Sequence, residues 1–551
     1  MSKKLSRFAA IALVCTTAST AFFSCADSGE KHSSGYNYES SYYDNNYQRK
    51  EYESSEESAE YSESSDEYYS EPEPVSPAEE YVTIIESGFK DPKSEPLSTF
   101  SADVDTASYA NVRRIIEDGS IIPDGAVRIE EFLNYFDYDY PQPENNEKFS
   151  RYTELADCPW NPLSKLLMVG IQAEEIKSEE SPDSNIVFLI DSSGSMSSYN
   201  KLPLVQSAFS LLAEELSPND RISIVTYANS SSTLIEGADA SRKDEILEAL
   251  YSITANGSTN GEGGIEQAYR IAEEYFISGG NNRVIIATDG DLNVGASSES
   301  ELKELIESKR DMGIYLSVLG FGTENIKDSR LEALADNGNG NYSYIDSIAE
   351  AQRVLVNEMS SLMYTVAKDV KIQVEFNPSQ VKAYRLIGYD NRLMDAHDFV
   401  NDAKDAGEVG SGHSVTALYE VQLTDAAGVY DGIELEFASE HKNEAADTSA
   451  RTELCKLSIA YKEPESENST AAGEVKYISD LMGMEKYNSE PSDNMLLASS
   501  VAEFAMLLKN SEYKENSSYD HVIKCAEQMA GGNEKVKELA ELAKTASSLY
   551  K

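Results

Sequence analysis

The sequence has few cysteines, and none of them belongs to a disulfide framework. Five cysteines occur in 551 residues. Cys15 and Cys25 lie near the N-terminus, whereas Cys158, Cys455 and Cys525 are an odd number of widely spaced residues. No two of them have the CxxC spacing of zinc and redox sites. A disulfide-stapled fold is therefore excluded, and zinc or redox chemistry has no support.

Basic charge is also scarce. The chain has 46 Lys and Arg against 97 Asp and Glu, which gives a formal net charge of −51. Such a surface repels phosphate backbones and anionic lipid headgroups. Nucleic-acid binding is therefore excluded, and contact with a membrane requires a covalent anchor.

A long hydrophobic run is missing as well, although the N-terminus has a short one. A basic segment (residues 3–7) precedes an apolar stretch (8–23) that is too short and too rich in Thr and Ser to span a bilayer. This stretch ends Phe22-Phe23-Ser24-Cys25, which resembles the lipobox of bacterial lipoproteins, with Phe22 at the usual Leu position. We predict a signal peptide (1–24) and lipidation of Cys25; the alternative is an ordinary cleaved signal peptide.

The segment after Cys25 lacks aliphatic residues. Residues 26–80 are dominated by Ser, Glu, Tyr and Asn. Such a composition cannot bury enough apolar surface to offset the entropy of ordering the chain. We predict a lipid-anchored, disordered acidic tether over residues 25–80, on the extracytoplasmic face of a membrane, at the cell surface or in the periplasm.

The middle of the chain has the pattern of an α/β domain. Short apolar runs at 186–190, 222–225, 284–287 and 314–319 alternate with amphipathic helical stretches. Continuous apolar runs are typical of parallel strands covered on both faces. We predict a doubly wound, mostly parallel sheet over residues 183–365.

The flanking regions have other patterns. Residues 81–182 contain short helical spacings, and 366–551 begin with alternating strands and end with helices. We predict an N-terminal flanking region and a C-terminal antiparallel β plus helical domain, whose halves pack together. Asp103 and Asp105 are interpreted as capping or packing residues, and Arg128 with Glu130 and Glu131 as a structural ion pair or a solvated face.

Candidate ligand residues follow two of the predicted parallel strands. Asp191, Ser193 and Ser195 follow the first strand directly, and Asp289 follows the strand at 284–287. Thr259 lies between them in a Gly-rich loop before a helix. Ligands of open α/β sheets bind at the carboxyl ends of the strands. Hydroxyl and carboxylate oxygens are the ligands suited to Mg²⁺, Mn²⁺ or Ca²⁺.

These residues resemble the metal-ion-dependent adhesion site of von Willebrand factor A domains. Asp191, Ser193 and Ser195 match its DxSxS motif, and Thr259 and Asp289 match its two remaining elements in order. The resemblance implies that the three hydroxyls bind the metal directly and that the two carboxylates act largely through bound water. Mg²⁺ is the expected cation, with Mn²⁺ or Ca²⁺ as alternatives.

Further motifs resemble a bacterial group of lipoproteins that carry such a domain between two flanking regions. The matching segments lie at 96–101, 103–106, 127–131, 134–136, 158–162, 384–389, 405–408, 412–413 and 416–420.

From these candidate ligands we expect a non-enzymatic function, in which the protein binds a partner protein through a metal ion. A cation held by neutral hydroxyls and water-separated carboxylates attracts an anionic oxygen, so we expect a partner protein that offers Asp or Glu. A hydrolase is the weaker alternative, because Ser195 does not lie in a GxSxG motif and residues 183–365 contain no histidine. A structural envelope scaffold without a functional metal is the third hypothesis.

Overall fold

The computed structural model describes residues 72–550 apart from 103–104, 177–181, 291–298, 324, 402–403, 405, 425–451 and 465–473. The predicted signal peptide, Cys25, most of the predicted tether and Asp103 lie outside the described residues. Residues Tyr69–Lys551 form one compact unit. Within the described part, no helix has both the length and the apolarity needed to cross a membrane.

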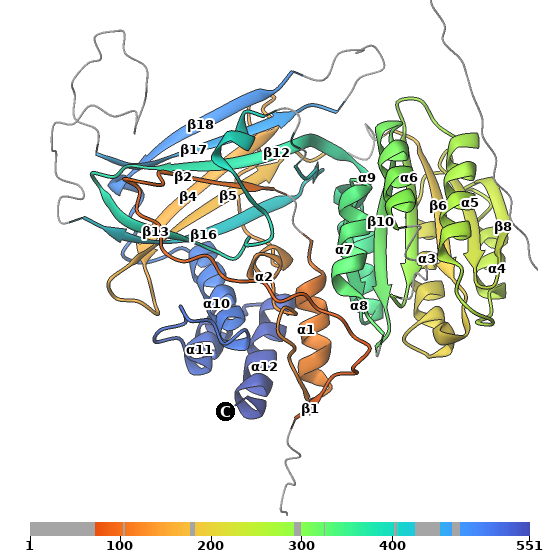
Figure 1. Cartoon of the computed structure of the whole chain (residues 1–551), viewed down its shortest axis with the longest axis horizontal. Coiled ribbons are helices and arrows are strands. Elements are labelled where there is room, and N and C mark those ends of the chain that lie inside the picture. The colour runs from red at the N-terminus through yellow and green to blue at the C-terminus, as the bar shows by residue number, and fades with distance from the viewer. Residues whose placement is uncertain are drawn as a thin grey trace, which may run out of the picture. The chain divides into compact units, whose positions relative to one another are not determined.

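A six-stranded sheet forms the centre of the α/β domain, with strand order β11-β10-β9-β6-β7-β8 (Figure 1). Neighbouring strands run parallel, except that the edge strand β8 is antiparallel to β7. The strands are β6 (Ser184–Asp191), β7 (Arg221–Tyr227), β8 (Ser231–Asp239), β9 (Asn281–Thr288), β10 (Ile314–Phe321) and β11 (Tyr342–Ile345). All residues of β6 and β9 are buried, which explains their continuous apolar sequences.

Helices cover both faces of this sheet and close two separate apolar cores. One face packs against α3 (Leu202–Glu215), α4 (Lys243–Ser252) and α8 (Ile348–Gln352). The other packs against α5 (Gly261–Glu274), α6 (Glu299–Asp311) and α7 (Asp328–Asn337). The doubly wound, mostly parallel fold predicted from the sequence is confirmed.

Two antiparallel sheets pack face to face around a third core. One sheet has the order β14-β2-β12-β17-β18, with β15 paired to β12, and the other has the order β13-β16-β5-β4. The strands of the first are β2 (Leu97–Ser101), β12 (Thr365–Phe376), β14 (Leu393–Met394), β15 (Val409–Gly410), β17 (Glu453–Lys462) and β18 (Lys476–Gly483). Those of the second are β4 (Phe149–Asp157), β5 (Lys165–Ala173), β13 (Val381–Ile387) and β16 (Ser414–Leu423).

The remaining helices share a fourth core with the outer face of the four-stranded sheet. They are α1 (Ala107–Glu117), α2 (Ile129–Tyr135), α10 (Asp493–Leu508), α11 (Tyr519–Met529) and α12 (Glu534–Leu549). The short helix α9 (Met359–Met363) leads from the α/β domain into β12, and the two-residue strands β1 (Glu73–Pro74) and β3 (Ser120–Ile121) pair with each other.

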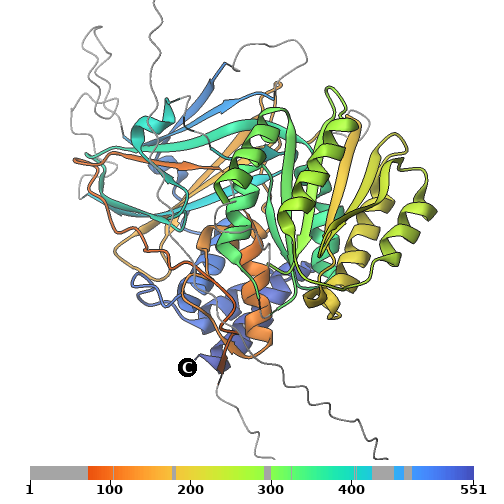
Figure 2. The same ribbon diagram turned by 45° about the vertical axis from the view of Figure 1, so that its right-hand side comes forward.

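The two flanking regions pack together, as expected. Strand β2 from the N-terminal flank pairs with β12 from the C-terminal flank, and β5 pairs with β16. Helix α1 packs against both α12 and the edge strand β11, so it lies between the C-terminal helices and the α/β sheet (Figure 2). The α/β domain is therefore inserted between halves that fold against each other.

Packed sequence begins before the predicted end of the tether. Strand β1 pairs with β3, and the buried carboxylate of Glu79 accepts a hydrogen bond from Arg114 Nη2 at 2.9 Å. An arginine of α1 thus supplies the counter-charge that lets an acidic residue of the predicted tether be buried.

Buried charges join the N-terminal flank to the α/β domain. Arg128 donates to Glu131 and to Asp328 of α7, and all three side chains are buried. Asp105 accepts a hydrogen bond from the Tyr342 backbone N–H at 2.7 Å. The structural ion pair predicted for Arg128 and the packing role predicted for Asp105 are confirmed. A solvated face at Glu131 is wrong, because the charge of Arg128 allows its burial.

Candidate metal site

Parallel pairing brings the two candidate carboxylates to one edge of the sheet. Strand β6 ends at Asp191, and Asp289 directly follows β9. Because β6 and β9 are hydrogen-bonded neighbours with Ile190 opposite Ala287, both residues lie at the carboxyl edge. This is the edge at which open α/β sheets bind ligands.

The loop after β6 holds its hydroxyl groups in a fixed arrangement. The Ser193 backbone N–H donates to Asp191 Oδ1 at 2.9 Å, and the hydroxyl oxygens of Ser193 and Ser195 are 2.9 Å apart. Asp191 and Ser193 are buried, whereas Ser195 is exposed. The loop therefore presents a pair of hydroxyl oxygens above a buried carboxylate, with one side open to solvent.

The loop that contains Thr259 lies next to the hydroxyl loop that follows β6. The Gly194 backbone N–H donates to the Gly257 carbonyl at 3.0 Å, which joins the two loops. Asn229 accepts hydrogen bonds from the Ser258 backbone N–H and hydroxyl group at 2.9 and 2.7 Å. Gly257 has a positive φ of 86°, and a Cβ atom there would lie 2.5 Å from Asn229 Nδ2. Only glycine suits this turn, which positions the half-buried Thr259.

A lysine that the sequence reading missed lies on the second carboxylate. Lys201 Nζ donates to Asp289 Oδ2 at 2.8 Å, and both side chains are buried. Asp289 Oδ1 is buried and has no hydrogen-bond partner among the described residues. Gly322, with φ of 77°, leaves room for the lysine stem, since a Cβ atom there would lie 2.4 Å from Lys201 Cε.

Burial and like charge disfavour the ionised form of Asp191. Burial, together with the smaller effect of the nearby charge of Asp289, raises the pKa of the Asp191 carboxyl to about 6. The hydrogen bonds from Ser193 act in the opposite direction. Thr288 Oγ1 lies 3.3 Å from Asp191 Oδ2 and adds a further polar contact. A cation at this edge would relieve the repulsion between the two carboxylates.

The donor set fits a divalent cation. It combines hydroxyl oxygens with the carboxylates of Asp191 and Asp289. One oxygen of the Asp289 carboxylate is buried and has no hydrogen-bond partner among the described residues. These are the hard oxygen ligands that Mg²⁺, Mn²⁺ and Ca²⁺ prefer. All five residues predicted from the sequence, Asp191, Ser193, Ser195, Thr259 and Asp289, belong to the three adjoining loops at this edge.

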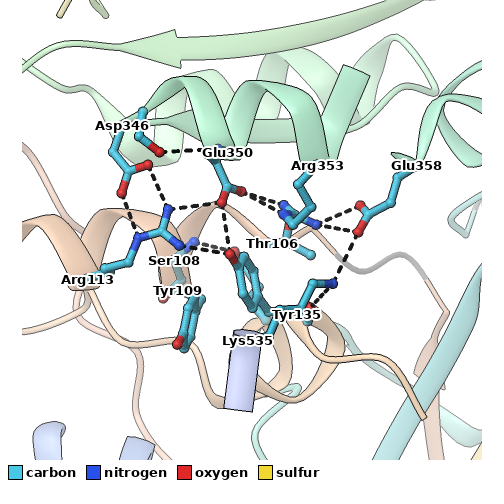
Figure 3. A network of polar contacts seen from close by, with 12 residues as sticks. Thr106, Ser108, Tyr109, Arg113, Tyr135, Asp346, Glu350, Arg353, Glu358 and Lys535 are labelled. Carbon is cyan, nitrogen blue, oxygen red and sulfur yellow. Dashed lines mark hydrogen bonds and ion pairs between the residues drawn. The ribbon is translucent and has the colours of Figure 1, made fainter. Parts of the chain in front are cut away.

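A cavity of about 820 Å³ adjoins the segment that follows the hydroxyl loop. Residues 198–200, which follow the hydroxyl loop, line it together with parts of α1, α8 and α12. A polar network forms its wall (Figure 3). Arg113 Nη2 donates to Asp346 and Glu350 at 2.7 and 2.9 Å, and Arg353 donates to Glu350 at 2.6 Å. Tyr135 OH donates to Glu350 at 2.9 Å. Both flanks thus contribute to the surface beside the candidate metal site.

Another group of acidic residues is neutralised by arginines. Carboxylate oxygens of Asp105, Glu131 and Glu332 lie within 4.8 Å of one another. Arg128 binds Glu131, and Arg392 donates to Asp105 and Glu332 at 3.1 and 2.9 Å. The guanidinium groups supply the positive charge here, so the group forms part of a structural ion-pair network.

The structure also contains a Cys–His–Glu arrangement outside the α/β domain. His521 Nδ1 lies 2.6 Å from Glu503 Oε2, and His521 Nε2 lies 3.5 Å from Cys525 Sγ. Burial raises the pKa of the Cys525 thiol, which disfavours the nucleophilic thiolate. The histidine and cysteine are one turn apart on α11, so helix geometry alone accounts for their contact. This arrangement gives no support to a hydrolase.

Known proteins match three successive parts of the chain. Residues 185–357 match the von Willebrand factor type A domain family, residues 75–168 match a family described as von Willebrand factor, and residues 361–549 match the C-terminal domain family of the uncharacterized protein YfbK. The chain is 41% identical to YfbK of Escherichia coli (strain K12) over 458 residues, which are 82% of this chain and 78% of that protein.

More distant proteins match smaller parts of the chain or match it at lower identity. Inter-alpha-trypsin inhibitor heavy chain H4 of Bos taurus is 26% identical over 195 residues, 33% of this chain and 21% of that protein. A solved structure of a von Willebrand factor type A protein from Catenulispora acidiphila is 14% identical and has a TM-score of 0.41, with 75% of this chain and 97% of that chain covered. The predicted resemblance is confirmed for the domain and its flanks, whereas lipidation of Cys25 stays a prediction.

Proposed function

Since the chain belongs to the family of von Willebrand factor type A domain proteins that includes Escherichia coli YfbK, we propose that it is a non-enzymatic cell-envelope protein that binds a partner protein through a divalent cation. Ser193, Ser195 and Thr259 would bind the cation through their hydroxyl groups. Asp191 and Asp289 would act largely through water. Mg²⁺ is the expected cation, with Mn²⁺ or Ca²⁺ as alternatives.

The geometry of the hydroxyl loop carries this proposal. Two hydroxyl oxygens 2.9 Å apart lie beside a buried carboxylate, and one of them belongs to the exposed residue Ser195. A bound cation would supply positive charge with an exchangeable coordination position on the solvent side. The chain's own residues orient the oxygen ligands: the Asp191 carboxylate fixes the Ser193 backbone, and the Gly257 loop fixes Thr259.

The chemistry of the partner follows from this arrangement. Hydroxyl ligands leave the charge of a bound cation largely uncompensated, so an anionic oxygen is the best additional ligand. We therefore infer that the partner offers the side chain of Asp or Glu. The net charge of −51 opposes an acidic partner at long range, but charges beyond about 8–10 Å are screened at physiological salt.

The proposed location rests on the N-terminal sequence. Acylation of Cys25 would hold the folded unit at the extracytoplasmic face of a membrane, with the acidic segment after it as a tether.

One observation favours the alternative of a scaffold without a functional metal. Lys201 already provides a positive charge for Asp289 inside the protein. In that case the lysine would replace the metal as the structural cation, and binding of any partner would be independent of divalent ions.

The two functions are distinguished by capturing the partner from native envelopes with the full-length protein. We expect capture in Mg²⁺, loss of capture with a chelator, and recovery when Mg²⁺ is restored. Thr259→Ala removes one hydroxyl ligand and should weaken capture at least about tenfold. Thr545→Ala, an exposed threonine of α12, is the matched control and should capture normally. Capture that is indifferent to both the chelator and Thr259→Ala would support the scaffold.

A further inference from the structure

A second cavity lies at the opposite end of strand β9 from the candidate metal site. It has a volume of about 360 Å³, within the range of small-molecule sites. Its lining combines residues of the α/β domain with residues of the flanking sheets, and it includes Arg283. Arg283 is the third residue of β9, and Asp289 follows the strand six residues later. At about 3.3 Å per residue, the two ends are about 20 Å apart.

Arg283 carries a buried positive charge without a paired carboxylate. The residue is only 2% exposed. Its Nη1 donates to Ser317 Oγ at 2.7 Å, and its guanidinium carbon lies 5.5 Å from the centre of the Tyr315 ring. Its Nε is buried and has no hydrogen-bond partner, and no described carboxylate forms an ion pair with it. Burial lowers the pKa of the guanidinium to about 10, so the group stays charged at pH 7.

The acidic side chains that line the cavity, those of Glu307, Asp336 and Glu408, contact other partners. Glu408, whose charge acts on Arg283 from a distance, accepts a hydrogen bond from Asn339. Arg392 binds Asp336 at 3.1 Å on the same cavity wall. Burying a charge without a counter-charge costs several kcal/mol, and other arginines of this molecule, such as Arg113 and Arg128, are buried with carboxylates.

We propose that this cavity is a binding site for a small oxyanion, a carboxylate or a phosphate group, held by Arg283. A guanidinium group offers several N–H donors in one plane, which matches the oxygens of either group. Asn337, Asn339 and Asn341 line the same cavity and add amide groups to its wall. Because the chain as a whole repels anions, saturable binding of an oxyanion requires such a built site.

Calorimetric melting of the full-length protein in nonionic detergent tests this site. The probes are sodium acetate and sodium phosphate, each compared with sodium chloride at equal ionic strength. We expect at least one oxyanion to raise the melting temperature by about 1–3 °C, in a saturable way. A rise with acetate alone identifies a carboxylate ligand, and a rise with phosphate alone identifies a phosphate-bearing ligand.

Variants show whether the effect belongs to Arg283. Arg283→Met removes the charge and should abolish the rise, while Arg242→Met, at an exposed arginine, should retain it. If Arg283→Met fails to fold, anomalous scattering from wild-type crystals soaked with selenate, in place of phosphate, or with bromoacetate, in place of acetate, should show the probe beside the guanidinium group. The absence of any rise beyond that in chloride, or an unchanged rise in Arg283→Met, would overturn the proposal, as would crystals in which neither probe lies at Arg283.

Discussion

Lys201 is the residue at the candidate metal site with the clearest testable consequence. Its ammonium group lies 2.8 Å from one oxygen of Asp289 and neutralises that carboxylate. A divalent cation bound at the proposed site would therefore compete with this internal monovalent charge. We expect the lysine to lower the affinity for metal and to stabilise the fold when no metal is bound.

Replacing Lys201 by Met should therefore tighten metal binding. With its internal counter-charge removed, Asp289 attracts a divalent cation more strongly, and we expect Mg²⁺ affinity to rise at least about tenfold in calorimetry. The metal-free variant should melt at a lower temperature, because removing one partner of a buried ion pair costs about 3–5 kcal/mol. Lys243→Met, at an exposed lysine of α4, is the control. Unchanged or weaker Mg²⁺ binding in Lys201→Met would show that the lysine and the metal ion do not compete for Asp289.

The sequence predicted the five ligand candidates but not the lysine. Asp191, Ser193 and Ser195 are close in sequence, and the ends of parallel strands meet at one edge, so their proximity follows from local pattern and topology. The contact between Lys201 and Asp289 joins residues 88 positions apart. A single lysine before a helix has no periodicity or motif that indicates its partner.

At the scale of elements, burial decided which strands could be predicted. Strands β6 and β9 are buried on both faces and have continuous apolar sequences. Strand β8 was not predicted, because it is half-exposed at the sheet edge and its sequence has neither a long apolar run nor a strict alternation of polar and apolar residues. Strands β4 and β5 are exceptions: they were missed although β5 is buried along almost its whole length. Strand β5 pairs with both β4 and β16, and these long-range pairings complete the second sheet.

The network around Arg113 joins three elements, α1, α8 and α12. Arg113 forms ion pairs with Asp346 and Glu350 (Figure 3). It also forms one with Glu538. These partners come from the α/β domain and from the C-terminal helix. The network therefore couples the stability of the α/β domain to that of both flanks.

Replacing Arg113 by Met should destabilise the whole folded unit. Asp346 would lose its counter-charge and Glu350 would keep only Arg353, so we expect a loss of about 3–5 kcal/mol in the free energy of unfolding. Denaturant unfolding followed by circular dichroism should show one cooperative transition at a lower midpoint. Arg270→Met, at an exposed arginine with surface ion pairs, should change the free energy by less than about 1 kcal/mol. A second transition for the α/β domain alone would show that the network does not couple the parts.

At the scale of the whole molecule, attachment to the membrane should depend on Cys25. The described cysteines are buried and free, and the proposed anchor lies in the N-terminal segment. Cys25→Ser should abolish acyl labelling and either release the protein from membranes or leave the signal peptide uncut. Metabolic labelling with a fatty-acid analogue and membrane fractionation measure both effects. Cys158→Ser, with a buried cysteine replaced, should still be labelled. A Cys25→Ser protein that stays attached and correctly processed would rule out lipidation at this residue.

The central claim is that the loops at the carboxyl edge of the sheet bind a divalent cation. Titration of the full-length protein with Mg²⁺ in a calorimeter tests it directly, with Asp191→Ala, Asp191→Asn and the exposed-site control Asp239→Asn. The asparagine variant keeps an oxygen that can accept the Ser193 backbone N–H, so it separates loss of charge from disruption of the loop. We predict saturable Mg²⁺ binding in the wild type and in Asp239→Asn, and loss of binding in both Asp191 variants while their circular dichroism stays native. Unchanged Mg²⁺ affinity in the folded Asp191 variants would contradict the assignment of the site.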